Sequence, residues 1–254
     1  MDQLRLSIEE LIFSFYSEGY FEQGMSLKEA YYPEVEDERL GFLFEIACRS
    51  LLAKGVLEFR NRQYRYKEEY RHFIQAMNDA SHTVKASTFG EIDEGFSTSF
   101  HTTKAGVYAH QTLYDQQVHQ IQKLKDDQQA EEQVTTFLNI QMSDQRLSVI
   151  TLQAEEFETL LEPASEAKDE WLSFLKLNKA EDPELVRTFV LDVRARKGQM
   201  DSLMKVAYDK NNQPDVESMI FVIPGERHSW LVWGIKENEF RIETAHRDGL
   251  RSIF

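Results

Sequence analysis

The stretch 217–245 constrains this chain most, because three short apolar runs follow one another there with turn signals between them. The runs span 218–224, 229–236 and 239–244 and are rich in Val, Ile, Phe and Trp. Pro224-Gly225 separates the first two runs, and Glu237-Asn238 separates the last two. Such a pattern is typical of antiparallel strands joined by tight turns. We therefore predict an antiparallel meander, with a further strand at 199–208 in front of it.

The composition predicts a soluble, globular, cytoplasmic protein. A chain of 254 residues with 41% hydrophobic residues can bury a sizeable core. The apolar runs are far shorter than the roughly 20 residues that a membrane span requires, so we expect no membrane insertion. The first residues also lack the basic and then apolar pattern of a signal peptide.

The charge balance argues against a general nucleic-acid binder. The formal net charge is -15, whereas a nucleic-acid binder needs a basic surface for the phosphates. Twelve acids against only Arg146 and Lys168 occupy 126–170, which fits either a solvated helical surface or a face for a basic partner. The single cysteine, Cys48, lies among apolar residues and is predicted to be a buried core thiol.

The first 66 residues have the element order of a winged helix. A helix with an apolar stripe starts after Ser7, which forms a capping box with Glu10. A second helix is predicted over 40–53, ending at Lys54-Gly55, and a hairpin over 56–66. The basic residues that would line the wing are Arg60, Arg62, Arg65, Lys67 and Arg71.

The remaining pattern places the chain in the α+β class. We predict a helix at 67–80, then strands at 82–87, 96–102, 107–114 and 118–124, with an acidic loop at 90–95. Further on we predict helices at 126–141, 154–161, 171–177 and 184–195 and a strand at 147–152. The expected architecture is two pseudo-symmetric halves, 1–125 and 126–254, each running helices and then a meander. We expect both halves to share a central, mostly antiparallel sheet in one compact unit, with a helical bundle in the second half.

No motif in the sequence predicts catalysis or a cofactor. His101, His110 and His119 recur every nine residues, but on antiparallel strands they need not converge, so we expect no metal site. His228-Ser229 lacks the Gly-x-Ser-x-Gly pattern of a nucleophile elbow. Phosphate-binding and dinucleotide-binding glycine patterns are also missing. We therefore predict that the protein is not an enzyme.

Several local patterns, in order along nearly the whole chain, resemble the EspG-like chaperones of type VII (ESX) secretion. They are the helix at 11–16, the segment Ala-Cys-Arg-Ser-Leu-Leu-Ala-Lys-Gly-Val-Leu at 47–57, the strand and helix within 148–161, and the closing strands at 219–224 and 230–233. The chain is richer in Lys, Glu, Gln and Phe than the actinobacterial members. It therefore looks like a Firmicutes counterpart, similar to the EsaE-type chaperones that bring LXG or nuclease toxins to the secretion ATPase.

This resemblance implies a non-enzymatic cytoplasmic chaperone with a quasi-two-fold central sheet. Its partner would be a secreted helical protein, a WXG- or LXG-type effector or the partner of one, with the secretion ATPase as a further partner. Carried over by position, the client surface would comprise Glu91, Ile92, Asp93 and Glu94 of the acidic loop and the helices around Trp171, Phe174 and Leu185.

The alternative function is a winged-helix transcription regulator with an α/β sensing domain. Residues 1–70 hold fourteen acids against nine bases, which disfavours DNA binding, and for the chaperone we expect no nucleic-acid partner.

Overall fold

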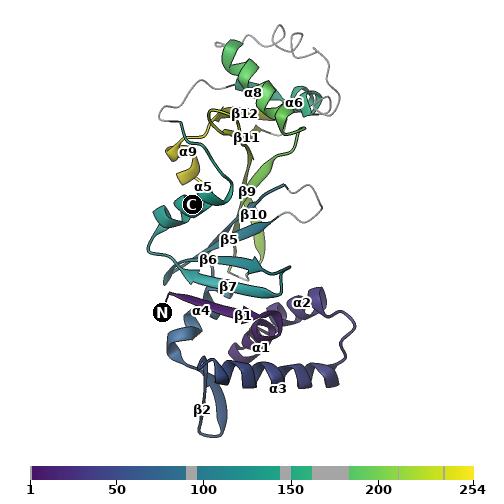
Figure 1. The fold of residues 1–254 in the computed structure, drawn as a ribbon, viewed down its shortest axis with the longest axis vertical. Helices are drawn as coiled ribbons and strands as arrows, with labels where there is room; N and C mark the ends of the chain where they lie inside the picture. The colour runs from purple at the N-terminus through teal and green to yellow at the C-terminus, as the bar shows by residue number, and fades with distance from the viewer. Residues whose placement is uncertain (1, 90–95, 144–149, 162–182, 211, 237) are drawn as a thin grey trace. The chain divides into compact units, whose positions relative to one another are not determined.

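The computed structural model describes residues 2–89, 96–143, 150–161, 183–210, 212–236 and 238–254 (Figure 1). The chain divides into two units. The first comprises 1–83, 98–126 and 208–213, and the second comprises 84–97, 127–207 and 214–254. The division lies near the predicted boundary at 125/126, but 84–97 and 208–213 each belong to the unit opposite to the predicted half.

Helix α1 (Ile8–Glu18) begins with the predicted capping box. The Ser7 hydroxyl accepts the Glu10 N–H at 3.3 Å, and the Glu10 carboxylate accepts the Ser7 N–H at 2.8 Å. Two further helices of the first unit also match the prediction, namely α3 (Asp37–Ala53) and α4 (Glu68–Asn78). Gly55 has a φ of +71°, which fits its predicted place just after α3. Helix α2 (Phe21–Tyr31) was not predicted.

Four antiparallel strands of the first unit lie in the order β1-β7-β6-β5. They are β1 (Gln3–Ser7), β5 (Ser97–Thr103), β6 (Gly106–Leu113) and β7 (Val118–Lys123), of which β1 was not predicted. The predicted hairpin is present as a separate two-stranded sheet, β2 (Leu57–Arg60) and β3 (Gln63–Tyr66). The hydrophobic core of this unit joins α1, α3 and α4 to β1, β6 and β7, and includes Leu6, Leu11, Leu51, Phe73, Tyr108 and Ile121.

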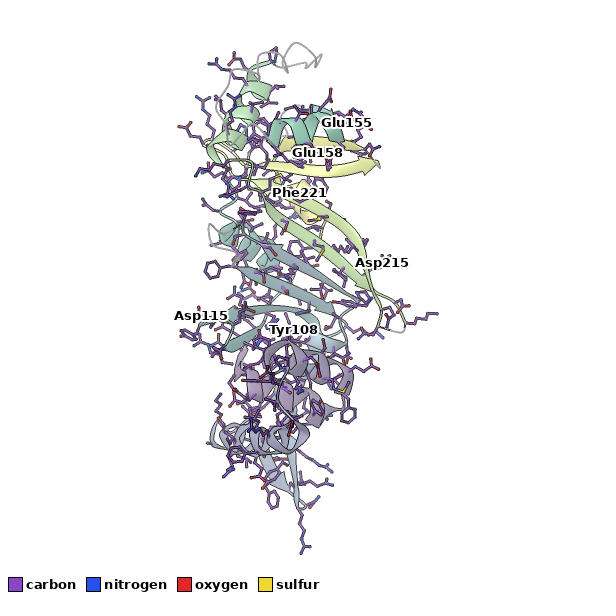
Figure 2. The ribbon with its side chains drawn as sticks, turned by 90° about the vertical axis from the view of Figure 1, so that its right-hand side faces the viewer. Tyr108, Asp115, Glu155, Glu158, Asp215 and Phe221 are labelled. Atoms are coloured by element: carbon purple, nitrogen blue, oxygen red, sulfur yellow. The ribbon has the colours of Figure 1, made fainter. Side chains whose placement is uncertain are left out.

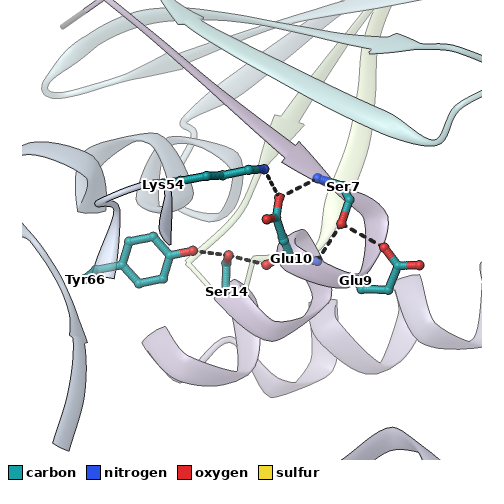
Figure 3. A network of polar contacts seen from close by, with 6 residues as sticks. All are labelled: Ser7, Glu9, Glu10, Ser14, Lys54 and Tyr66. Atoms are coloured by element: carbon teal, nitrogen blue, oxygen red, sulfur yellow. Dashed lines mark hydrogen bonds and ion pairs between the residues drawn. The ribbon is translucent and has the colours of Figure 1, made fainter. Parts of the chain in front are cut away.

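A buried polar network ties α1 to the end of α3 and to β3 (Figure 3). The Glu10 side chain is only 3% exposed, and its Oε2 lies 2.6 Å from Lys54 Nζ. One turn further along α1, the Ser14 hydroxyl hydrogen-bonds the Glu10 carbonyl and the Tyr66 hydroxyl. Burial raises the pKa of Tyr66, so its hydroxyl stays protonated. The capping residue Glu10 therefore also positions the neighbouring elements.

The strands of the second unit lie in the order β4-β9-β10-β11-β12-β8. They are β4 (His82–Ser87), β9 (Asp201–Tyr208), β10 (Pro214–Ile223), β11 (Trp230–Lys236), β12 (Glu239–Thr244) and β8 (Ile150–Gln153). The predicted meander is confirmed, because β10 pairs antiparallel with β11 and β11 with β12. The edge strand β8 pairs antiparallel with β12. Of the strand predicted at 147–152, residues 147–149 lie outside the described residues and 150–152 belong to β8.

The described helices of the second unit are α5 (Asp127–Phe137), α6 (Ala154–Leu161), α8 (Pro183–Ala195) and the short α9 (Arg247–Arg251). Helix α5 ends earlier than predicted, since Asn139 adopts a φ of +50°. Trp230 is fully buried, and its ring contacts Phe189 of α8 edge-to-face at 5.2 Å between centroids. These two aromatics lie in a core that also contains Leu152, Val186, Val190, Val232 and Ile242. The helix predicted at 171–177 lies outside the described residues.

The fold is therefore mixed, with helices and a large antiparallel sheet, as the sequence predicts. The pseudo-symmetry of two halves stays a prediction. Across the part of the chain that the structure describes, each helix is too short or too polar to cross a bilayer.

Candidate partner-binding site

Two exposed aromatic residues, Phe89 and Phe96, flank the predicted acidic loop. They are 53% and 74% exposed. The Thr88 N–H donates to the Phe96 carbonyl at 2.9 Å, and the Thr88 hydroxyl donates to the same oxygen at 3.3 Å. The chain is therefore held together where it enters and leaves 90–95. Large apolar side chains presented on a fixed backbone are suited to packing against a partner.

Residues 88–89 and Phe96, at the two ends of the acidic loop, form what we call the loop base. Asp201 anchors this loop base to the rest of the second unit. Its buried Oδ1 accepts the Phe89 N–H at 2.8 Å and a hydrogen bond from Arg196 Nη2 at 2.9 Å. A buried carboxylate is costly unless donors replace its lost hydration, and here a backbone amide and a guanidinium do so. Because Arg196 follows α8 and Asp201 begins β9, one carboxylate connects the loop base to both elements.

The end of α8 also meets the end of α6. The Gly198 N–H donates to the Val193 carbonyl at 3.0 Å, which closes the last turn of α8. Gly198 has a φ of +75°, and a Cβ at this position would lie 2.9 Å from the Leu161 carbonyl oxygen. Only glycine fits this close approach without a shift. The base of the loop, the end of α8 and the end of α6 are thus mutually positioned.

Exposed residues of these two helices give the surface an acidic and partly apolar character. Helix α6 carries the exposed carboxylates Glu155 and Glu158 (Figure 2). On α8, Leu191 is 52% exposed, although leucine in a helix of this kind usually faces the core. A partner with an apolar centre and basic flanks would match these side chains.

The pair His228-Ser229 does not form a catalytic site. Ser229 is fully buried, and its hydroxyl oxygen accepts the Gln141 N–H at 3.0 Å. Its Oγ is therefore closed to a substrate. Burial lowers the pKa of His228, whose ring lies 4.7 Å from the Trp230 ring.

The rings of His101, His110 and His119 converge, which the nine-residue spacing left open. The rings of His101 and His110 stack at 6.0 Å between centroids, and those of His110 and His119 at 5.2 Å. His110 Nε2 and His119 Nδ1 share a 2.9 Å hydrogen bond, and Thr83 Oγ1 lies 2.9 Å from His101 Nδ1. Desolvation lowers the pKa of His101 and of His119 to about 4. Within the described residues, no three His, Cys, Asp or Glu side chains are arranged to hold a metal ion.

Only some of the basic residues predicted to line the wing are exposed on the hairpin. Arg60, Arg62 and Arg65 are exposed on the β2–β3 hairpin. Arg71 instead lies in α4, where its Nε is 2.9 Å from Glu18 Oε2.

The predicted burial of Cys48 is confirmed.

The comparisons with known proteins identify the family. Residues 3–254 match the family described as "Uncharacterised protein YfjC". The chain belongs to the YfjC family. It is 50% identical over 256 residues to the "Uncharacterized protein YfjC" of Bacillus subtilis (strain 168), covering all of this chain and 99% of that protein.

This YfjC-family chain also shares its fold with a solved chaperone structure. The Mycobacterium tuberculosis type VII secretion system chaperone EspG5, solved in complex with the PE25-PPE41 dimer, superposes with a TM-score of 0.59. The match covers 99% of this chain and 94% of the EspG5 chain, with 9% sequence identity. At that identity the likeness shows the fold alone, and it agrees with the EspG-like fold that the sequence suggests.

Six of the seven predicted client-binding residues of the YfjC-family chain lie outside the described residues: Glu91, Ile92, Asp93, Glu94, Trp171 and Phe174. The seventh, Leu185, is 7% exposed and packs in the core of the second unit. Its side chain supports α8 from inside. The client-binding role of this set stays a prediction.

Sequence reasoning missed Phe89, Phe96 and Asp201. A signal for the first two was present, because Phe89-Gly90 and Gly95-Phe96 mirror each other around the acidic loop. No local pattern indicates Asp201, because its hydrogen-bond partners Arg196 and Phe89 are 5 and 112 residues away in the sequence.

Proposed function

We propose that this YfjC-family protein is a non-enzymatic cytoplasmic chaperone of type VII secretion that binds a secreted helical protein. The observation that carries the proposal is the shared fold with EspG5 along nearly the whole chain. The EspG5 structure holds a PE25-PPE41 dimer, which makes a helical client the reasonable class of partner. We propose a WXG- or LXG-type effector, or the partner of one, as the client, with the secretion ATPase as a second contact.

The client surface that we propose is centred on Phe89 and Phe96. The anchored loop base supports this choice, because side chains on a backbone fixed by Asp201 lose little further entropy when a partner binds. The acidic loop through Glu91, Asp93 and Glu94 and the helix predicted around Trp171 and Phe174 would complete the surface. An acidic loop favours a client with a basic helical tip.

The absence of catalysis is part of the same proposal. The two polar clusters that most resemble catalytic groups are engaged otherwise: Ser229 by the Gln141 amide, and the stacked histidines by one another and by Thr83. Buried histidines and a buried serine contribute to core packing and form hydrogen bonds with other buried polar groups. This fits a structural role better than a catalytic one.

Co-purification tests the proposal. The full-length protein would be co-expressed with each WXG- and LXG-type protein encoded in the same genome, and we expect a stable complex with one of them. The double variant Phe89→Ser/Phe96→Ser should lose most of that binding. The matched control is Val216→Ser/Ile235→Ser, which removes two apolar side chains that are 57% and 49% exposed on β10 and β11.

Two results would count against the proposal. Unchanged client affinity in Phe89→Ser/Phe96→Ser would remove the loop base from the binding surface. Tight binding to the promoter of its own locus, in the absence of any protein client, would favour the winged-helix regulator instead.

A further inference from the structure

The β2–β3 hairpin carries two exposed aromatic side chains that the core does not use. Leu57 and Tyr66 form a cross-strand pair, and both are buried in the core of the first unit. The next pair on the same face, Phe59 and Tyr64, is 60% and 51% exposed, with ring centroids 4.9 Å apart. Figure 1 shows the hairpin projecting past α3. The apolar face therefore continues beyond the part of the hairpin that folding requires.

Three arginines lie on the same hairpin, with Arg60 and Arg65 on the face opposite the aromatic pair. Arg60, Arg62 and Arg65 are all exposed, in a protein with a net charge of -15. Arg62 lies in the turn, where Asn61 and Arg62 both have positive φ, as a two-residue hairpin of type I′ requires. Among the ion pairs of the described residues, none neutralises these three, and Arg65 Nη2 donates only to the Gln63 amide oxygen.

The surroundings favour a polypeptide over a nucleic acid as the occupant. The helix before the hairpin, α3, exposes Phe42 and Ile46, which have no donor or acceptor for base edges or phosphates. Its Arg49 is already paired with Glu45 at 3.4 Å. Three arginines suffice for a short acidic peptide, whereas a phosphate backbone engages a longer basic track.

We propose that the β2–β3 hairpin docks an acidic segment of a partner protein that also carries apolar side chains. Phe59 and Tyr64 pack against the apolar side chains, and Arg60, Arg62 and Arg65 pair with the carboxylates. Guanidinium groups suit this role because they bind carboxylates through two parallel hydrogen bonds. The inference goes beyond the proposed client site, which is built from other residues.

Two synthetic peptides test the hairpin. Both have twelve residues, with Leu and Phe at the same positions, and one has six Glu where the other has six Lys. We would titrate each into isotope-labelled full-length protein and follow the backbone amides. We expect the Glu peptide to shift the amides of 57–66, and the Lys peptide to leave them unchanged.

Variants then separate the charge from the aromatic contribution. Arg60→Glu/Arg62→Glu/Arg65→Glu should weaken the Glu peptide at least about tenfold, and more at low salt. Phe59→Ser/Tyr64→Ser should weaken it as well, through lost packing. The control Lys85→Glu/Lys104→Glu/Lys210→Glu makes the same change in net charge at exposed lysines outside the hairpin and should change affinity less than about twofold. Far-ultraviolet circular dichroism checks that each variant is folded.

Several results would overturn the inference. Equal binding of the two peptides, or equal loss in the arginine variant and the lysine control, would mean that the hairpin charges select nothing. Tighter binding of a twelve-nucleotide single strand than of the Glu peptide would make nucleic acid the occupant. Self-association that disappears in Phe59→Ser/Tyr64→Ser would make it a second copy of this chain. None of these results depends on Phe89 and Phe96, so the chaperone proposal stands or fails separately.

Discussion

The indole N–H of Trp230 donates a 2.8 Å hydrogen bond to the carboxylate of Asp192, and both residues are buried. The same carboxylate accepts the Glu226 N–H at 3.2 Å, and a Cβ at Gly225 would lie only 2.3 Å from Asp192 Oδ2. Helix α8 is thereby fixed to the start of β11 and to the turn before it. This contact holds in place the helix whose last turn leads to Arg196 and the loop base.

Replacing Trp230 with Ala should lower the melting temperature before it affects any binding. Truncating a fully buried aromatic side chain costs roughly 3 to 5 kcal/mol of unfolding free energy, and here Asp192 also loses a donor. Urea denaturation followed by fluorescence and circular dichroism measures the change. Val216→Ala, at an exposed strand position, is the control and should cost less than about 0.5 kcal/mol. A loss below about 1 kcal/mol in Trp230→Ala would contradict the packing described.

Replacing Lys54 with Met should destabilise the first unit, because it leaves the Glu10 carboxylate buried without its cation. Removing one partner of a buried ion pair costs about 3 to 5 kcal/mol, and the partial exposure of Lys54 places the expected loss at the lower end. Arg49→Met breaks the exposed pair with Glu45 and should cost no more than about 0.5 kcal/mol. The double variant Glu10→Gln/Lys54→Met should recover part of the loss. Equal losses of unfolding free energy in Lys54→Met and Arg49→Met would mean that the buried Glu10–Lys54 pair stabilises the protein no more than an exposed ion pair does.

The sequence predicted those elements whose signals are local. The capping box, the helix-ending Gly55 and the Pro-Gly turn each act within a few residues, and the structure has α1, α3 and the meander where they indicate. Strand β1 has only Leu4 and Leu6 as an apolar signal, and it exists because it pairs with β7 some 115 residues away. Helix α2 carries Gly24 in its middle, where a Cβ would lie 2.6 Å from the Tyr16 ring. Tertiary packing explains that glycine, and a local pattern cannot reveal it.

The cluster of His101, His110 and His119 likewise depends on strand pairing that a local sequence pattern cannot reveal. Two short turns fix the register so that His101 is opposite Tyr108 and His119 is opposite Thr112. His110 is thus the diagonal neighbour of both other histidines on one face of the sheet. The nine-residue spacing alone does not determine this, because one residue more in either turn would place the rings on opposite faces.

From the stacked histidines we predict that the free energy of unfolding falls as the pH drops below about 6.5. The folded-state pKa of His101 and of His119 is about 4, and the unfolded value is about 6.5. Between these values the unfolded chain binds more protons, so each of the two histidines costs roughly 1.4 kcal/mol of unfolding free energy per pH unit lost. Above 6.5 both states are neutral at these sites, and this contribution is constant.

Urea denaturation between pH 7.5 and 5.5 measures this slope, above the range where carboxylates titrate. His110→Gln breaks the 2.9 Å bond to His119 and opens the stack, so the slope should flatten even if the variant is less stable at pH 7.5. A flat profile in the unchanged protein would mean that water reaches the three rings.

Reversing the charge of the predicted client loop should impair binding without affecting folding. The change is Glu91→Lys/Asp93→Lys/Glu94→Lys, between the two phenylalanines of the anchored loop base. The sequence predicts an exposed loop at 90–95, and surface substitutions usually cost under about 0.5 kcal/mol, so we expect the melting temperature to stay the same. If the client presents a basic helical tip, three attractions become three repulsions. Association should slow, and the dissociation constant should rise at least about tenfold, most strongly at low salt.

The client protein identified by co-purification is the ligand for that measurement, with stopped-flow or surface plasmon resonance at two salt concentrations. Lys85→Glu/Lys104→Glu/Lys210→Glu shifts the net charge by the same amount in the opposite direction and should leave the affinity within about twofold. Because Phe89 and Phe96 are unchanged in the loop variant, its residual affinity reports their apolar contribution. Unchanged affinity of the loop variant at low salt would show that the carboxylates do not contact the client, and the helix predicted around Trp171 would then be the surface to test.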